Sequence, residues 1–133
     1  MKWLSRWEEP FYAALRIVAG LMFAAHGAQK LFGVLPVPNH PAPPIEFPSQ
    51  VWFGGVIELV CGLAIALGFY ARCAGFVASG TMAVAYWQFH HNRELPAPVQ
   101  NGGELAVVYC FLFLFISAKG PGMLSLTAKD KKD

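Results

Sequence analysis

Charged side chains are scarce in this chain of 133 residues: they make up 14% of it, against about 25% in a typical soluble domain. Hydrophobic residues make up 56% instead. The basic residues that do occur form no face or stripe, which argues against binding to nucleic acid. A composition so poor in charge favours an integral membrane protein over a soluble domain.

Cysteine is also scarce, and linear cofactor motifs are missing. Cys61, Cys73 and Cys110 lie far apart with no C-x-x-C pair, which favours structural thiols over a dithiol redox centre. The sequence has no Walker motif, no G-x-G-x-x-G fingerprint, no haem-attachment motif and no G-x-S-x-G elbow. No spacing such as E-x-x-H places two metal ligands on one helix, so we expect no metal site. Flavin or haem chemistry would need a partner subunit, or binding residues without a linear signature.

Long apolar runs are what the chain has in abundance. They cover residues 11–32, 51–70, 71–89 and 103–118, and we interpret each as a helix that crosses the hydrocarbon core of a bilayer. Lys2 and Arg6 before the first run resemble the start of a signal peptide, but the run continues to Phe32 and three more follow. We therefore expect an uncleaved first helix. The pattern predicts an all-α fold, a four-helix transmembrane bundle, with residues 1–133 as a single domain.

The distribution of basic residues predicts the orientation of this bundle. If the helices alternate across the bilayer, the side with both termini carries seven lysines and arginines, and the other side holds only Arg93. The seven are Lys2, Arg6, Arg72, Lys119, Lys129, Lys131 and Lys132. Because basic residues in short loops favour the cytoplasmic side, we expect both termini to be cytoplasmic in a bacterial inner membrane.

Short connections and small residues indicate how the helices are arranged. The turn at residues 68–72 is so short that the second and third helices must be antiparallel neighbours. The loop of residues 33–50 contains six prolines, which favour stiff, extended backbone; it is either a spacer or a lid over an outward-facing pocket. Gly54, Glu58 and Gly62 follow at intervals of four residues, which places Glu58 on the face where another helix packs closely.

Polar and titratable side chains gather near the outer ends of the predicted helices. His26, Gln29 and Lys30 share one side of the first helix, and Glu58 lies about 10 Å along the second. The inner half has only Arg16. The third and fourth helices add the remaining members of the outer layer, Gln88, His90, His91 and Glu104. This asymmetry predicts a functional site in the outer half, with His26, Lys30, Glu58 and Glu104 as candidate catalytic residues.

Lys30 and Glu58 would be costly inside apolar helices without partners. Lys30 either reaches the outer interface along its long stem or enters an ion pair. Glu58 is short and deep, so it either pairs with Lys30 or Arg16 or carries a proton. A pair that only specifies helix packing is the competing interpretation. His26 is either a proton donor or a satisfied interior histidine.

Aromatic residues make up 14% of the chain, and most suit lipid-facing or core positions. Trp52 and Trp87 lie at the mouth of the outer layer, with Gln88 beside Trp87. A quinone would suit this layer, because flat rings can stack on it while His26 and Lys30 bond its carbonyls. We therefore take Trp52, Trp87 and Gln88 as candidate cofactor-binding residues and a quinone as the suspected cofactor.

Several motifs occur in the order found in a known family. The first helix contains Leu15-Arg16-Ile-Val-Ala-Gly20 and His26-Gly27-Ala-Gln-Lys30-Leu-Phe-Gly33. Gly55-Val-Ile-Glu58-Leu-Val-Cys-Gly62 and Leu67-Gly-Phe-Tyr-Ala-Arg72 follow, and Asn101-Gly-Gly-Glu104 precedes the last helix. Over nearly its whole length the chain resembles the DoxX family of small four-helix membrane proteins, with a longer proline-rich loop. The resemblance implies a link to redox chemistry, because the family's name comes from a subunit of a thiosulfate:quinone oxidoreductase and other members are linked to quinone or catechol stress and to thiol oxidation.

Three classes of function follow from these observations. The leading one is a quinone-linked redox protein, or a subunit of an oxidoreductase complex, whose partners are the lipid bilayer, a quinone and a redox partner subunit. In it, His26 and Lys30 bond or protonate the acceptor, while Glu58 and Glu104 act as charge partner or proton relay. The alternatives are a small proton-coupled transporter with Glu58 as its titrating group, and a non-catalytic assembly subunit. The residues leave open whether copies of the chain form a homo-oligomer.

Overall fold

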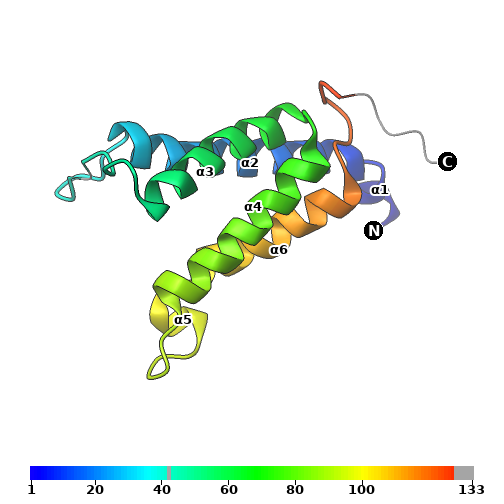
Figure 1. The fold of residues 1–133 in the computed structure, drawn as a ribbon. Helices are drawn as coiled ribbons and strands as arrows, with labels where there is room; N and C mark the ends of the chain where they lie inside the picture. Colours follow the sequence, from blue (N-terminus) through cyan, green and yellow to red (C-terminus); the bar gives the residue numbers. More distant parts are fainter. Residues whose placement is uncertain (42, 128–133) are drawn as a thin grey trace.

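The computed structural model describes residues 1–41 and 43–127, and that part of the chain is mostly helical (Figure 1). An isolated bridge between Val37 and His40 is the only strand-like pairing in these ranges. The elements are α1 (Lys2–Ser5), α2 (Glu8–Phe32), α3 (Gln50–Leu67), α4 (Ala71–Ala85), the π-helical turn η1 (Tyr86–His90), α5 (Pro98–Asn101) and α6 (Glu104–Lys119). The predicted all-α fold is confirmed. Lys129, Lys131 and Lys132, which entered the orientation argument, lie outside the described residues.

The long helices match the four predicted segments to within a few residues. The helix α3 begins after Ser49, whose hydroxyl accepts a hydrogen bond from the Trp52 amide at 3.1 Å. It ends at Gly68, whose φ of 66° would strain any residue with a side chain. The third predicted segment corresponds to α4 followed without a break by η1.

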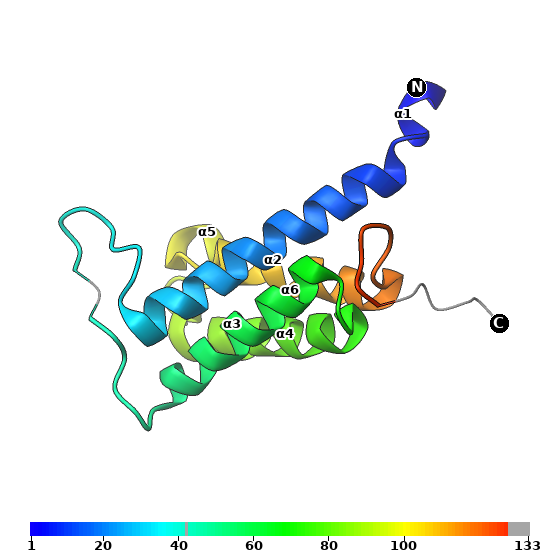
Figure 2. The same cartoon turned by 90° about the horizontal axis from the view of Figure 1, so that it is seen from above.

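The helices form two pairs, with the α2–α3 pair lying over the α4–α6 pair (Figure 2). The pairs meet mainly where α3 packs on α4, which are the antiparallel neighbours predicted from the short turn between them. The pairs lie close together at the end that carries α1 and residues 120–127, here called the terminal end (Figure 1). They diverge toward the end that carries residues 33–49 and α5, here called the loop end (Figure 1).

Glycines allow α2 and α3 to touch. A Cβ atom at Gly20, Gly27 or Gly62 would lie 2.4–2.5 Å from a backbone nitrogen of the other helix, so no side chain fits there. Gly62 and the buried Glu58 therefore lie on a packed face, as their spacing predicted. Gly54, the third member of that series, does not: no atom lies within 4 Å of the position its Cβ would take.

Aromatic side chains join the two helix pairs in the middle of the molecule. The ring of Phe23 on α2 packs against Tyr109 and Phe113 of α6, with centroid distances of 5.6 and 4.7 Å. Tyr109 and Phe113 are themselves stacked at 5.1 Å. Together with Ala106 and Ile116 they form the buried stripe of α6, whose spacing is that of one helix face.

The outward faces of the long helices are apolar. Their exposed side chains include Val18, Leu21, Met22, Val60, Leu63, Phe76, Val77, Val108, Phe111 and Phe115. In the described part of the chain, α2 and α3 are long and apolar enough to cross a membrane, with mean hydropathies of 1.4 and 1.8. The helices α4 and α6 have 15 and 16 residues, which is fewer than the 18 residues required of a membrane-crossing helix by the same length criterion.

Arg16 ties two segments together at the terminal end. Its fully buried guanidinium donates to the carbonyl oxygens of Ile65 and Ala66 in the last turn of α3, at 2.6 and 2.7 Å. It also donates to those of Met123 and Leu124, at 3.1 and 2.8 Å. The last carbonyls of a helix have no partner within it, so Arg16 satisfies them and holds residues 120–127 against the bundle. Arg16 is therefore not the partner of Glu58.

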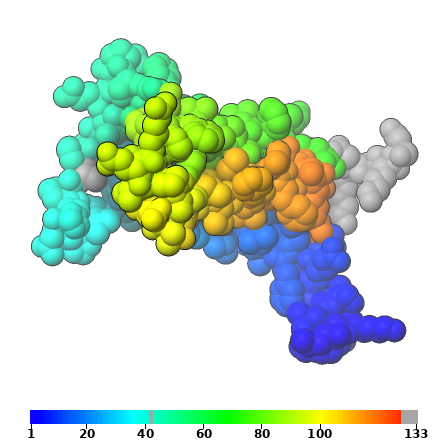
Figure 3. All heavy atoms as spheres, turned by 90° about the horizontal axis from the view of Figure 1, so that it is seen from below, coloured from blue at the N-terminus to red at the C-terminus, as the bar shows by residue number. Residues whose placement is uncertain are grey.

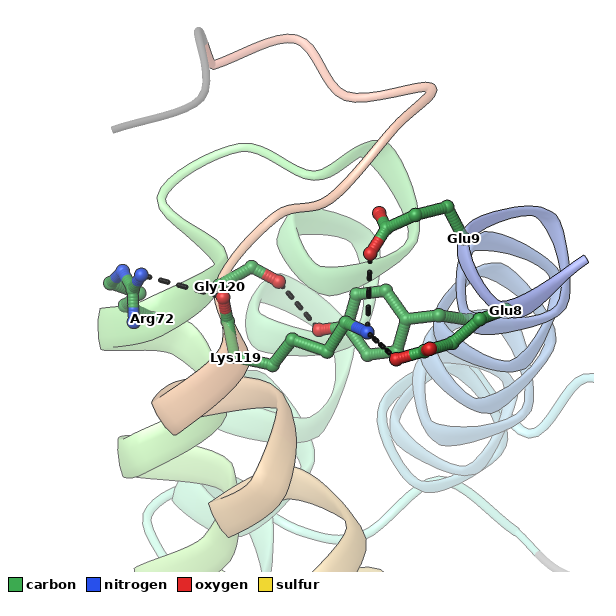
Figure 4. A network of polar contacts seen from close by, with 6 residues as sticks. Glu8, Glu9, Arg72, Lys119 and Gly120 are labelled. Atoms are coloured by element: carbon green, nitrogen blue, oxygen red, sulfur yellow. Dashed lines mark hydrogen bonds and ion pairs between the residues drawn. The ribbon is translucent and has the colours of Figure 1, made fainter. Parts of the chain in front are cut away.

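Lys119 joins the end of α6 to the start of α2 (Figure 4). Its ammonium lies 3.2 Å from carboxylate oxygens of both Glu8 and Glu9, and beside it Arg72 donates to the carbonyl of Ser117 at 3.1 Å. Desolvation opposes the charge on Lys119, but the hydrogen bonds to Glu8 and Glu9 outweigh it and raise the pKa of Lys119 above its usual value. The ion pairs therefore stabilise the fold at neutral pH, and the contribution of the Lys119 charge is lost as the pH rises through that raised pKa.

The short helix α1 stands apart from the bundle. None of its residues is buried, and Figure 3 shows the N-terminal residues projecting from the body of the molecule. Trp3 and Trp7 expose 60% and 44% of their surfaces. This exposure suits tryptophans of a membrane interface.

Candidate functional site: a cavity between the helix pairs

A cavity of about 710 Å³ lies where the two helix pairs diverge. Residues from all four long helices and η1 line it, and most of them are apolar. Its polar or ionisable lining residues are His26, Lys30, Gln50, Glu58, Thr81, Gln88, His90 and Tyr109. No described residue of the proline-rich loop before Gln50 is part of the lining.

Lys30 and Glu58 form an ion pair in the wall of this cavity. The Lys30 ammonium lies 2.6 Å from Glu58 Oε1. The Lys30 side chain is 35% exposed and that of Glu58 only 4%. The glycine contacts between α2 and α3 bring the two together, since a Cβ at Gly55, one turn from Glu58, would lie 3.2 Å from Lys30 Cβ. Of the partners that the sequence left open for Glu58, the structure selects Lys30.

Two buried oxygen atoms in the cavity wall have no hydrogen-bond partner in the described part of the chain. They are Glu58 Oε2 on α3 and the hydroxyl of Tyr109 on α6. The two groups are close enough to interact electrostatically. Buried polar groups are nearly always hydrogen-bonded, so two unpartnered ones on residues that line the same cavity indicate that something else supplies the missing bonds.

His26 and Gln88 complete the polar part of the lining. His26 is half-buried and makes no hydrogen bond to any described residue, so its ring nitrogens are available to a ligand. Gln88 in η1 accepts a hydrogen bond from Gln50 at the start of α3, which bridges the two helix pairs at the loop end. His90 also lines the cavity, with Nδ1 3.4 Å from the carbonyl oxygen of Asn101.

The other predicted site residues lie outside the lining. Trp52 packs its ring against Phe47 and Phe53 rather than into the cavity. Trp87 is 63% exposed, and Glu104 is exposed in the first turn of α6. Of the seven predicted residues, the structure therefore brings together His26, Lys30, Glu58 and Gln88.

Tyr109 is a lining residue that the sequence analysis did not single out, because a tyrosine among so many aromatic residues suits a core or lipid-facing position. Its position three residues after Ala106 and four before Phe113 places it on the inward face of α6. That spacing was the available signal. A buried tyrosine hydroxyl usually finds a partner, but that of Tyr109 has none among the described residues.

Two other kinds of site, a metal site and a second hollow, have less support. No group of three or more histidine, cysteine, aspartate or glutamate side chains is placed to hold a metal ion within the described ranges. A second hollow, of about 760 Å³, lies at the loop end and is lined by residues 89–95, 100 and 101. Its residues are mostly exposed loop residues, and neither of the unpartnered buried oxygens faces it.

Fold and site together define a small all-helical protein with apolar outer faces and a charged pair in an internal cavity. The family model of DoxX matches residues 11–91, which include His26, Lys30 and Glu58. The chain belongs to the DoxX family of membrane proteins. It is 36% identical over 140 aligned residues to a protein from Haemophilus influenzae described as "Uncharacterized protein", with 95% of each chain covered. No solved structure matches the chain.

Proposed function

We propose that residues 1–133 form a single four-helix transmembrane domain in a bacterial inner membrane, with both termini in the cytoplasm. Besides α2 and α3, the helix α4 runs on into η1, and the 16 residues of α6 span about 24 Å. Exposed Phe76 on α4 and Phe111 on α6 present to lipid the same kind of surface as α2 and α3. The excess of basic residues at the terminal end supports the orientation.

We infer that this domain binds a quinone in the cavity and serves as a quinone-linked redox protein or as a subunit of an oxidoreductase complex. The observation that carries this proposal is the pair of unpartnered buried oxygens beside the Lys30–Glu58 ion pair, in a largely apolar cavity of about 710 Å³. Such a volume and such a mixture of apolar walls with a few convergent polar groups are typical of small-molecule sites.

Each polar residue has a role in this proposal. A bound quinone supplies an acceptor for two electrons and two protons. Lys30 offers the ammonium protons that Glu58 does not take, and His26 offers a ring N–H that can bond a carbonyl or deliver a proton. Glu58 holds Lys30 in place. Exposed Glu104 lies next to the lining residue Leu105, where it can relay protons from the outer surface.

We take the electrons to come from a partner subunit, since the chain carries no linear motif for flavin or haem. A redox partner subunit at the bundle is therefore part of the proposal. The transporter alternative is weaker, since a carboxylate held 2.6 Å from an ammonium is already neutralised. A pure assembly subunit would need the ion pair but not the cavity around it.

Quenching of tryptophan fluorescence by a short-chain quinone tests the proposal. We expect saturable quenching in purified protein that weakens in His26→Ala and Lys30→Met. Gly80→Leu should abolish it, since a Cβ at Gly80 meets no atom within 4 Å and a larger side chain there fills the cavity. Phe76→Leu, on the outward face of α4, is the matched control. Non-saturable quenching that is identical in all variants would mean simple partitioning into lipid and would favour the assembly subunit.

A further inference from the structure

The Glu58 carboxylate determines which chemical form of a ligand the cavity can satisfy. Lys30 donates to Oε1 at 2.6 Å, which leaves Oε2 as a buried oxygen without a partner in the described ranges. A carboxylate paired with an ammonium can accept hydrogen bonds but cannot donate one. The group that complements Oε2 must therefore carry an O–H or an N–H.

The Tyr109 hydroxyl places a weaker demand on the ligand. It is also buried and unpartnered, and it comes from the other helix pair. A phenolic hydroxyl can donate or accept, so it can bond a ligand oxygen whether that oxygen is a carbonyl or a hydroxyl. A quinone offers carbonyl oxygens only, which leaves Glu58 Oε2 unsatisfied. The corresponding hydroquinone carries two O–H groups and can satisfy both protein oxygens.

We propose that the cavity selects the dihydroxy form of an aromatic ligand over the quinone form. One ligand O–H donates to Glu58 Oε2, and Tyr109 holds another ligand oxygen. This inference rests on the proposed function, since it places a quinone-type ligand in the cavity, and it adds the form that is bound and a binding role for Tyr109. A hydrogen bond to a charged acceptor in a buried site favours the donor-bearing form by roughly tenfold or more.

Calorimetric titration of the protein in lipid nanodiscs under argon tests this selection. Three probes share one ring: tetramethyl-1,4-benzoquinone, its hydroquinone, and the dimethyl ether of that hydroquinone, which keeps both oxygens but has no O–H. We expect the hydroquinone to bind at least about tenfold more tightly than either of the others. A tenfold preference would also raise the two-electron potential of the bound couple by about 30 mV.

Two nearly isosteric variants separate the two protein oxygens. In Glu58→Gln the amide oxygen stays toward Lys30, which puts the NH₂ donor where Oε2 was, so the preference should disappear or reverse toward the quinone. Tyr109→Phe keeps the ring packed against Phe23 and stacked on Phe113 and should weaken the binding of all three probes by a similar factor. The controls are Glu46→Gln in the exposed loop and Tyr70→Phe at the terminal end, which should change nothing.

The possible failures are distinguishable. Equal affinity for quinone and hydroquinone, or an ether that binds as tightly as the hydroquinone, would overturn the selection while leaving quinone binding intact. A preference that survives Glu58→Gln would show that Oε2 is not the discriminating atom and would also overturn it. Absence of saturable binding by any probe would overturn the proposed function and this inference with it.

Discussion

At the scale of single residues, the important fact is the unequal burial of one ion pair. The Glu58 side chain is 4% exposed, whereas that of Lys30 is 35% exposed and can reach toward the outer interface. The carboxylate therefore depends on the lysine more than the lysine depends on it. Because Lys30 contacts Oε1 only, Glu58 Oε2 remains buried without a partner among the described residues.

A double-mutant cycle of Lys30→Met and Glu58→Gln should show that the two residues are coupled. We expect the sum of the two single losses to exceed the loss in the double variant by about 1–3 kcal/mol, because each single change leaves one charge unpaired. Lys30→Met should cost more than Glu58→Gln, since it leaves the more deeply buried charge alone. Unfolding in mild detergent provides the measurement. Additive losses of stability would show that the two residues have no coupling energy.

At the scale of helices, glycine positions separate packing from cavity formation. Gly27 supports the contact of α2 with α3, since its Cβ would lie 2.4 Å from the Leu59 nitrogen. Gly54 is on the same face of α3 as Glu58 but has open space in front of it. The first glycine brings the two charged residues together, and the second leaves room beside them.

Gly27→Ala and Gly54→Ala should therefore differ in their effects on stability. We expect Gly27→Ala to destabilise the protein by about 1–3 kcal/mol, because the backbones must move apart. Gly54→Ala should be neutral or stabilise it by up to about 1 kcal/mol, because alanine is the better helix former. Thermal unfolding of both variants in the same detergent checks this, and equal effects would contradict the described contact between α2 and α3.

The helix α3 also depends on Arg16 at its C-terminal end. In Arg16→Met the carbonyls of Ile65 and Ala66 lose their buried donor, as do those of Met123 and Leu124. We expect a loss of about 3 kcal/mol of stability and faster proteolysis within residues 120–127. Arg72→Met, which removes contacts of a more exposed side chain, is the comparison and should cost less. Unchanged proteolysis in Arg16→Met would mean that the segment is held by other contacts.

At the scale of the whole molecule, the long apolar runs were enough to locate the helices, and the scarcity of charge within them was enough to single out Lys30 and Glu58. The divergence of the helix pairs was not predictable, because it depends on which small residues actually meet across each interface. Gly54 and Gly62 look alike in the sequence, yet only Gly62 contacts α2. The role of Arg16 was hidden for a similar reason, since its partner Leu124 lies 108 residues away.

Orientation in the membrane is the second property of the whole molecule. In a cysteine-free background, single cysteines at Pro43 and Asn92 should react with an impermeant maleimide in intact cells, while one at Ser5 should react only after lysis. The expectation follows from the seven-to-one distribution of basic residues. The reverse pattern would place the cavity in the cytoplasmic half of the membrane.

The most direct test of the account is to locate the bound ligand itself. A photoreactive short-chain quinone should crosslink to residues that line the cavity, such as Ile57, Met82 and Leu105, and excess unlabelled quinone should suppress the adducts. Gly54→Leu, which fills the cavity, should remove them without unfolding the protein. Mass spectrometry of the peptides gives the answer. Adducts scattered over outward-facing residues such as Phe76 and Phe111, and unaffected by Gly54→Leu, would contradict a ligand site in the cavity.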